Sequence, residues 1–171
     1  MEKWDLYTAD RNLTGKTMIR GEETPEGFYH LGVHVWVRNS EGKYIISQRA
    51  ASREVCPLMW ETVAGSVVAG EDSMTGALRE VKEEIGLDFS PEDGRVVYSY
   101  MGDGVTSRAI VDVYLFEYDG EIDLSSATTG EVAQSKWLSR EEIVELRKSG
   151  KLVSILEYFF EGKVDGCKCI S

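Results

Sequence analysis

The amino-acid sequence predicts one domain of the α/β (α+β) class, in which helices pack on a β-sheet. Strand-like segments occur both before and after one strongly amphipathic helical segment, and further helical segments follow near the C-terminus. The length of 171 residues suits a single domain with a sizeable core. The apolar fraction of 42% and the charged fraction of 29% are ordinary for a soluble globular protein.

The first part of the chain is predicted to consist of strands. Residues 1–27 combine short apolar pieces with turn formers, a pattern that indicates a small N-terminal β flap. Residues 30–38 and 43–49 are rich in β-branched residues and flank the turn Asn-Ser-Glu-Gly, which indicates an antiparallel hairpin. Shorter strands are expected at 58–64 and 67–68, and they lead into the central helix.

The best-defined helix is predicted from Ser73 to Ile85. Its apolar residues recur at the i, i+3, i+4 spacing of one helix face and are Met74, Ala77, Leu78, Val81 and Ile85. Asp72 or Ser73 can cap the N-terminus, and Gly86 is a typical residue beyond the C-terminus. A carboxylate face lies beside the apolar stripe and consists of Glu80, Glu83 and Glu84.

The second half of the chain is predicted to contain three strands, at 95–101, 105–118 and 132–138. A capping-box sequence beginning at Ser139 opens a helix that ends near residue 148, and a last helix is expected at 153–161. The domain is therefore expected to span residues 1–163, with the flap as its first part. Residues 164–171 are expected to form a polar tail.

The charge and hydropathy of the chain restrict its partners. The formal net charge of −11 excludes nucleic-acid binding through a basic face. No apolar run reaches the roughly 18 residues of a membrane span, and the N-terminus lacks the apolar region of a signal peptide. We expect a cytoplasmic protein with a small-molecule partner and no membrane contact. The sequence does not decide between a monomer and a homodimer.

The three cysteines do not form a disulfide framework, because their number is odd and their spacing is irregular. Cys167 and Cys169 form a Cys-x-Cys pair in the polar tail. Such a pair can bind a metal, but a reduced, unstructured tail is the favoured interpretation. Cys56 lies in the expected loop after the first hairpin.

Four carboxylates lie close together in sequence, at Glu71, Glu80, Glu83 and Glu84. A solvated glutamate-rich helix face usually has lysine partners four residues on, but here Glu80 has Glu84 at that position, which is a like-charge pair. The cluster therefore needs a counter-charge, and a bound divalent metal supplies one. A metal also solves the problem of an acidic protein that acts on a phosphate compound.

The complete spacing of this stretch, GSVVAGEDSMTGALREVKEEIGL from Gly65 to Leu87, matches every fixed position of the Nudix box. The chain therefore resembles the Nudix hydrolases. The resemblance implies an α/β/α sandwich with a mixed central sheet and a loop–helix–loop at the box. It also implies a Mg²⁺- or Mn²⁺-dependent pyrophosphohydrolase, in which water attacks phosphorus in a diphosphate linked to another group.

The resemblance also implies roles for individual residues of the box. Glu83 and Glu84 would ligate Mg²⁺ or Mn²⁺, Glu80 would ligate the metal or act as base, and the Gly65 carbonyl would complete the shell. Oxygen ligands of this kind are those that hard divalent ions prefer. A pair between Arg79 and Glu71 would fix the loop against the helix.

Four residues outside the box are weaker candidates. Arg49 is either a phosphate contact or a surface arginine, and Arg53 is a weaker candidate of the same kind. Glu131, before the last predicted strand, either reaches the metals or the attacking water as a catalytic residue or lies on the surface. Trp60 is interpreted mainly as a core residue, although an edge of its ring could stack on a base of the substrate.

Three further side candidates lie on the first hairpin and in a later predicted turn. Asp103 is predicted to lie in a turn, from which it could reach the site. His30 and His34 share one face of their strand, and a structural role is favoured for both.

An alternative is suggested by the residues around the box. The stretch SQRAASREVCPLMWETVAGSV resembles the isopentenyl-diphosphate isomerase-like subset of the Nudix proteins, in which the position of His30 binds a metal. The isomerase has a cysteine just before the box glycine and a histidine just after it, where this chain has Ala64 and Ser66. A hydrolase is therefore favoured over an isomerase, with a non-catalytic nucleotide-sensing module as the third alternative. The group attached to the diphosphate stays open.

Overall fold

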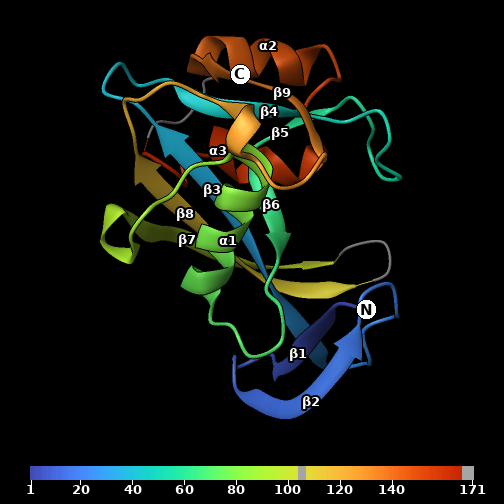
Figure 1. Cartoon of the computed structure of the whole chain (residues 1–171). Helices are drawn as coiled ribbons and strands as arrows, with labels where there is room; N and C mark the ends of the chain where they lie inside the picture. Colours follow the sequence, from blue (N-terminus) through green and yellow to red (C-terminus); the bar gives the residue numbers. More distant parts are fainter. Residues whose placement is uncertain (104–106, 167–171) are drawn as a thin grey trace.

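A mixed β-sheet forms the middle layer of the structure, a computed structural model that describes residues 1–103 and 107–166 (Figure 1). Its central strand β3 (Phe28–Arg38) pairs in parallel with β8 (Arg108–Glu117) and antiparallel with β6 (Val63–Ser66). Strand β7 (Gly94–Asp103) pairs antiparallel with β8. The parallel pair between β3 and β8 requires a crossover connection, and the central helix lies in that connection.

Strand β4 (Tyr44–Arg49) extends the sheet away from β3. The predicted hairpin turn is present, but β3 and β4 pair only between Arg38 and Tyr44. Along its length β4 pairs instead with β9 (Val132–Leu138) and, near its end, with β5 (Trp60–Glu61). The last loop of the chain before β9 is thereby brought beside the loop that follows β4.

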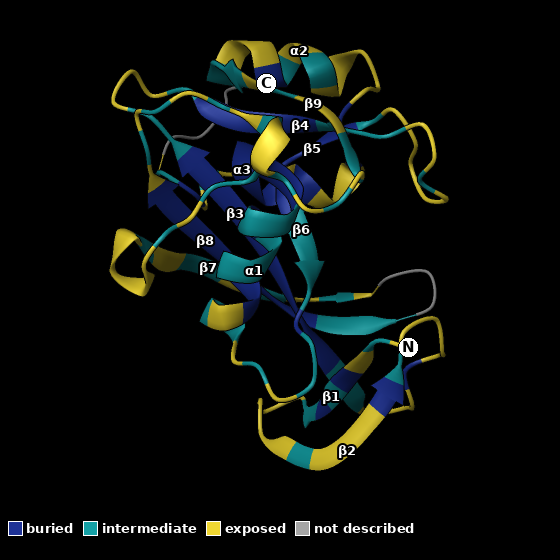
Figure 2. Cartoon of the chain, in the orientation of Figure 1, coloured by how far each residue is buried: buried dark blue, intermediate teal, exposed yellow. Residues whose placement is uncertain are grey.

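Helices cover both faces of the sheet, as Figure 2 shows by the buried strands between them. Helix α1 (Ser73–Ile85) packs on one face, where Val33 and Val35 of β3 contact the apolar stripe of the helix. Helices α2 (Arg140–Lys148) and α3 (Glu157–Phe160) pack on the other face, where the ring of Phe159 stacks on that of Trp36 at 4.3 Å. The α/β/α sandwich with a mixed sheet is therefore confirmed.

The predicted bounds of α1 and β9 agree with the structure, whereas several other predictions are wrong. Residues 67–68, expected to form a strand, do not, and Asp103, expected in a turn, is the last residue of β7 (Gly94–Asp103) and pairs with Arg108. The helix expected at 153–161 is a 3₁₀ turn (Ser154–Leu156) followed by one turn of α-helix, because three consecutive aromatic residues are buried and cannot share one helix face. The strand expected at 58–64 is divided at Thr62, whose hydroxyl donates to the Val35 carbonyl. Two other 3₁₀ turns lie at Pro91–Asp93 and Leu124–Ser126.

The predicted N-terminal flap is a hairpin of β1 (Lys3–Thr8) and β2 (Leu13–Ile19), which joins the sheet where β1 pairs with the start of β3. Arg11, in the turn between these strands, forms hydrogen bonds to both carboxylate oxygens of Asp112 on β8. The same carboxylate accepts hydrogen bonds from Ser73 at 2.5 Å and Ser99 at 2.6 Å. One buried carboxylate therefore joins the flap, the start of α1 and strands β7 and β8.

The C-terminal part of the chain packs against the domain up to residue 166. Val164 is buried in the core, and Asp165 accepts a hydrogen bond from Tyr44 and pairs with Arg140. The predicted Cys167 and Cys169 pair lies outside the described residues. Among the helices that the structure describes, none is long and apolar enough to cross a membrane.

Replacement of Asp112 by Asn is expected to lower the free energy of unfolding by about 2–4 kcal/mol, because the Arg11 charge loses its buried partner. Burial by itself would raise the pKa of Asp112, but the hydrogen bonds from Arg11, Ser73 and Ser99 outweigh it and lower the pKa. The carboxylate therefore stabilises the fold above the unfolded-state pKa of about 4, and this stability is lost as the pH falls through the lower folded-state pKa.

Urea unfolding of the wild type and of Asp112→Asn at pH 7 and pH 3 measures this effect. The difference in stability is expected to be large at pH 7 and to shrink at pH 3. An equal difference at both pH values would contradict the role of the ionised carboxylate.

Candidate active site

The backbone at Gly65, at the end of β6, lies directly against the carboxylate of Glu80 on α1. A Cβ atom added to Gly65 would lie 2.0 Å from the carboxyl carbon of Glu80, so a side chain at this position would displace the Glu80 carboxylate. The same holds one turn earlier, where a Cβ on Gly76 would lie 2.9 Å from the Val67 side chain. These two glycines allow the loop and the helix to pack in direct contact and place the helix carboxylates beside β6.

Local signals fix both ends of α1. Asp72 accepts a hydrogen bond from the Thr75 amide at 2.8 Å, which caps the N-terminus. Gly86 ends the helix with a φ of 74°, a left-handed conformation that favours glycine. A Cβ there would also approach the backbone of Ala127 to 2.8 Å, so the loop after the 3₁₀ turn Leu124–Ser126 passes close to the end of the helix.

Arg79 connects the loop to the carboxylates of the helix. Its Nε donates to both carboxylate oxygens of Glu71 at 3.0 and 3.2 Å, and its Nη2 donates to the Ser66 carbonyl at 2.9 Å. Its Nη1 donates to Glu80 at 2.8 Å and to Glu83 at 3.2 Å. The Arg79–Glu71 pair that the resemblance implies is thus present in the structure, and Arg79 also partly neutralises two of the candidate metal ligands.

Glu84 is the most deeply buried carboxylate of α1, with 5% of its surface exposed. Burial raises its pKa well above the ordinary value, and the charges of Glu61, Glu80 and Glu131 raise it further, against the opposing effect of Arg49. Burial also raises the pKa of Glu80, although Arg79 opposes that shift. A carboxylate cluster with raised pKa values is one that a cation would stabilise in the ionised form.

Glu131 reaches this cluster because its loop is bound to the last turns of α1. The carbonyl of Glu83 accepts hydrogen bonds from the amides of Thr128 and Thr129 at 3.0 and 3.1 Å, and from the Thr129 hydroxyl at 3.1 Å. On its other side the Glu131 carbonyl accepts from the Ala50 amide, and its carboxylate pairs with Arg53 at 2.5 Å. The loop before β9 therefore brings a fourth carboxylate to the three of α1.

These side chains line one cavity of about 260 Å³, which we call the carboxylate cleft. Its carboxylates are Glu2, Glu80, Glu83, Glu84 and Glu131, and its arginines are Arg20, Arg53 and Arg79. Gly65 and Ser66 form its wall on β6. In this arrangement the arginines form ion pairs with several of the carboxylates. Among the described residues, no three His, Cys, Asp or Glu side chains are arranged as a metal site.

A second cavity of about 500 Å³ adjoins the cleft and shares Arg20, Arg53 and Glu131 with it. Arg49 also lines this cavity, which we call the arginine cavity. Arg49 is largely buried and pairs with Glu61, and its Nε donates to the Val55 carbonyl at 2.9 Å. The two candidate arginines are therefore brought together, and Arg20 of the flap joins them.

Two residues of this region were not identified in the sequence. Glu61 is buried next to the box, and burial raises its pKa despite Arg49. The sequence feature that could have identified Glu61 is a charged residue within an otherwise apolar strand. Arg20 gave no such signal, because only the fold brings the end of β2 to the cleft. Trp60 is 8% exposed within the core, where the Lys136 ammonium lies over its ring, and this packing agrees with the core interpretation.

The NUDIX domain family matches residues 28–159 of this chain, which is more than half of its length. The chain belongs to the NUDIX family. It is an enzyme, a hydrolase of phosphoric anhydride bonds. An uncharacterized Nudix hydrolase of Listeria innocua is 37% identical over 161 residues, which cover 94% of this chain and 91% of that protein.

Solved structures agree with the Nudix fold. DR0079 from Deinococcus radiodurans aligns with a TM-score of 0.73 and 21% identity, over 94% of this chain and 98% of its own. A bifunctional NMN adenylyltransferase/ADP-ribose pyrophosphatase of Francisella tularensis, solved with AMP and a manganese ion, aligns with a TM-score of 0.59 and 19% identity, over 79% and 42% of the two chains.

The resemblance to the isomerases is narrower. The isopentenyl-diphosphate Δ-isomerase of Shigella flexneri is 27% identical over 89 residues, which cover 52% of this chain and 49% of that enzyme. The similarity to this isomerase thus extends over about half of the chain.

Replacement of Glu84 by Gln is expected to stabilise the metal-free protein at pH 8, because a buried charge is removed. The folded-state pKa of Glu84 is raised, so its contribution to stability is lost as the pH rises above the unfolded value of about 4.3. We expect a gain of about 1–2 kcal/mol, or roughly 2–8 °C in Tm, measured by thermal unfolding in a chelator.

The gain is expected to shrink as the pH falls toward 5, where wild-type Glu84 takes up its proton. Replacement of the exposed Glu145 by Gln, whose partner is the surface Lys148, is the matched control and should leave Tm nearly unchanged. A lower Tm for Glu84→Gln in the chelator would show that the metal-free fold stabilises the carboxylate, contrary to this account.

Proposed function

We propose that this Nudix enzyme is a Mg²⁺- or Mn²⁺-dependent pyrophosphohydrolase. Its substrate is a nucleoside diphosphate-linked or other diphosphate-containing small molecule, and water attacks phosphorus. The observation that carries the proposal is the contact between the carboxylate cleft and the arginine cavity, which share Arg20, Arg53 and Glu131. A cluster of cation-binding groups beside a cluster of anion-binding groups suits a metal–phosphate compound.

The residues of the cleft fit a hard divalent ion. The candidate donors are the carboxylates of Glu80, Glu83 and Glu84 and the Gly65 carbonyl, which are oxygen ligands of the kind that Mg²⁺ and Mn²⁺ prefer. Glu84 has no hydrogen bond or ion pair among the described residues, so its ionised form lacks a partner until a cation binds. When bound, the ion would polarise a phosphoryl oxygen and lower the pKa of a water molecule.

The protein's own groups orient the reactants. Arg79 keeps Glu71 and the Ser66 carbonyl in place, so the loop that carries Gly65 holds its position against α1. Glu80 and Glu131 are the two carboxylates available to accept the proton of the attacking water. Burial raises the pKa of Glu80, which makes its carboxylate a stronger base than that of an exposed glutamate.

The arginine cavity would bind the part of the diphosphate that extends beyond the metal. Arginine presents a planar set of N–H donors that matches phosphate oxygens. The chain as a whole carries a net charge of −11, so a local positive region is needed to admit an anion. Arg49, Arg53 and Arg20 line this cavity, where they pair with Glu61, Glu131 and Glu2, and they would supply it when phosphate oxygens replace these carboxylates.

An isomerase is the less favoured function. At the two positions where the isomerase has its cysteine and histidine, the structure has Ala64 and Ser66 in the wall of the carboxylate cleft, and neither side chain is a base or a metal ligand of comparable strength. The known manganese- and AMP-bound relative of this fold supports nucleotides as the first substrates to test.

Replacement of Glu83 by Gln is expected to lower kcat by about 100-fold or more while Tm in a chelator changes by no more than a few degrees, because one ligand charge is lost and the fold is retained. The measurement is product release from a panel of nucleoside diphosphates, triphosphates and dinucleotides, with Mg²⁺ and with Mn²⁺. A chelator should abolish wild-type turnover. Reaction in ¹⁸O-labelled water should place one ¹⁸O atom in a phosphate product.

Three results would each redirect the proposal. Full activity of Glu83→Gln would remove Glu83 from the ligand set. Formation of the allylic isomer from isopentenyl diphosphate, followed by NMR, would favour the isomerase. Binding of nucleotides with no turnover under any metal would favour a nucleotide-sensing module. Glu145→Gln again serves as the control for non-specific effects of losing a carboxylate.

A further inference from the structure

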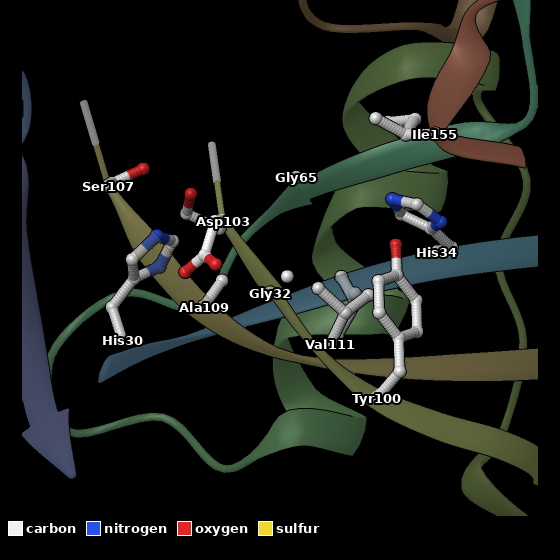
Figure 3. Close-up of a pocket in the computed structure, with 13 residues that line it drawn as sticks. His30, Gly32, His34, Gly65, Tyr100, Asp103, Ser107, Ala109, Val111 and Ile155 are labelled. Carbon is white, nitrogen blue, oxygen red and sulfur yellow. The ribbon is translucent and has the colours of Figure 1, made fainter. Parts of the chain in front are cut away.

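A third cavity of about 260 Å³ lies on the face of the sheet opposite α1, between β3, β7 and β8 (Figure 3). It shares Gly65 and Ser66 with the carboxylate cleft, so the two cavities adjoin at the end of β6. Asp103 is the charged residue among its described lining residues, neither lysine nor arginine is among them, and its surface is mainly apolar. A phosphate group would therefore lie in the cleft, and this cavity is suited to the uncharged part of a substrate.

One polar atom in the wall of this cavity has no partner. His30 is 4% exposed, its ring stacks on Trp4 with 4.2 Å between centroids, and its Nδ1 lies 3.1 Å from the Leu31 carbonyl. Its Nε2 is buried and has no hydrogen bond in the described part of the chain. An unpaired buried polar atom costs about 1–3 kcal/mol, so its presence in a cavity wall points to a ligand.

The contacts of His30 determine what Nε2 can do. The Leu31 carbonyl can only accept, so the Nδ1 atom facing it carries the proton. Burial lowers the pKa of His30, against the opposing effects of the Leu31 carbonyl and Glu2, and a neutral imidazole has one proton. Nε2 is then a hydrogen-bond acceptor. The missing partner is therefore a donor, an N–H or an O–H.

The other walls of the cavity are consistent with a flat organic group. Tyr100 presents an aromatic ring, and Val111 and Ile155 present apolar surface. His34 is also neutral, because burial lowers its pKa to about 4, and its Nδ1 is engaged with the Tyr158 hydroxyl at 2.8 Å. Its ring thus adds surface without adding charge.

We infer that this cavity binds the nucleoside part of the substrate, and that a base N–H or sugar O–H of the nucleoside donates a hydrogen bond to Nε2 of His30. This assignment rests on the proposed hydrolysis of a diphosphate in the adjoining cleft. A prenyl chain has no donor and would leave Nε2 unpaired in an apolar environment, so the cavity discriminates against hydrocarbon groups. His30 is accordingly a specificity-determining residue of this enzyme.

The first test is ¹⁵N NMR of the wild-type protein labelled at histidine, without metal. The sequence has only two histidines, so His34 is the internal control. Adenosine, guanosine, cytidine and uridine are added in turn, because these probes carry no phosphate and need neither metal nor turnover. At least one nucleoside is expected to shift the Nε2 resonance of His30 upfield, as acceptance of a hydrogen bond does, with a smaller change at His34.

The second test compares two substitutions that separate the ring nitrogens. The side-chain amide of Gln reaches the position of Nε2 and can place its oxygen there, whereas the shorter side chain of Asn reaches only the position of Nδ1. With the best nucleotide of the substrate panel, His30→Asn is expected to raise KM by about 2- to 12-fold, the worth of one hydrogen bond, with kcat little changed. His30→Gln is expected to stay within about twofold of wild type. The Tm of both variants verifies that they fold.

The outcomes separate this inference from the proposed function. If the wild type hydrolyses nucleotides but no nucleoside shifts His30, or if His30→Gln and His30→Asn have equal KM values, the cavity assignment is wrong and the hydrolase stands. If no nucleotide is hydrolysed but a nucleoside shifts His30, the hydrolase fails and the cavity assignment stands. A large shift of the Nε2 resonance of His30 on addition of diamagnetic Mg²⁺ alone, with little change at His34, would overturn the inference and make His30 a metal ligand.

Discussion

The guanidinium of Arg79 is the interaction on which the geometry of this active site depends. It is held between a loop and a helix, with Glu71 and the Ser66 carbonyl on the loop side and Glu80 and Glu83 on the helix side. Without this cation the carboxylates would repel one another across a partly buried space. With it, the metal-free protein can fold while the candidate ligands already lie together.

The site occupies both faces of the sheet near strand β3. The carboxylates of α1 lie on one face of the sheet and the cavity containing His30 lies on the other, while Gly65 and Ser66 contribute to both cavities. A substrate with a phosphate end and an uncharged end would pass from one face to the other at the end of β6. The absence of side-chain bulk at Gly65 serves both the approach of Glu80 and this passage.

The sequence was sufficient where the signals are local. Helix α1 was predicted with its observed bounds, because the Asp72 cap, the apolar stripe and the Gly86 stop all lie within one segment. The fold class and the box followed from the same kind of information. The last helix was predicted wrongly, because the burial of Tyr158, Phe159 and Phe160 is decided by their tertiary contacts and not by a helical period.

The features that the sequence did not reveal all depend on pairs of residues that are distant along the chain. The approach of Arg20 to Arg53, the burial of Glu61 against Arg49 and the closeness of Glu131 to α1 each require the completed sheet. The same is true of His30, for which a structural role was favoured. Its stacking on Trp4 agrees with that role, but the free Nε2 became visible only when all neighbours were in place.

The buried carboxylates show why such a site is costly to the fold and still useful. The pKa of Glu84 is raised because the side chain is buried and its charged neighbours are mainly acidic. Those surroundings reduce the stability of the metal-free protein near neutral pH, but they also give a cation a larger gain when it binds. The free-energy cost of keeping the buried carboxylates ionised destabilises the metal-free cleft, and a bound cation would remove this cost. The stability of the protein and the affinity of its cleft for metal are consequently expected to change in opposite directions when Glu84 loses its charge.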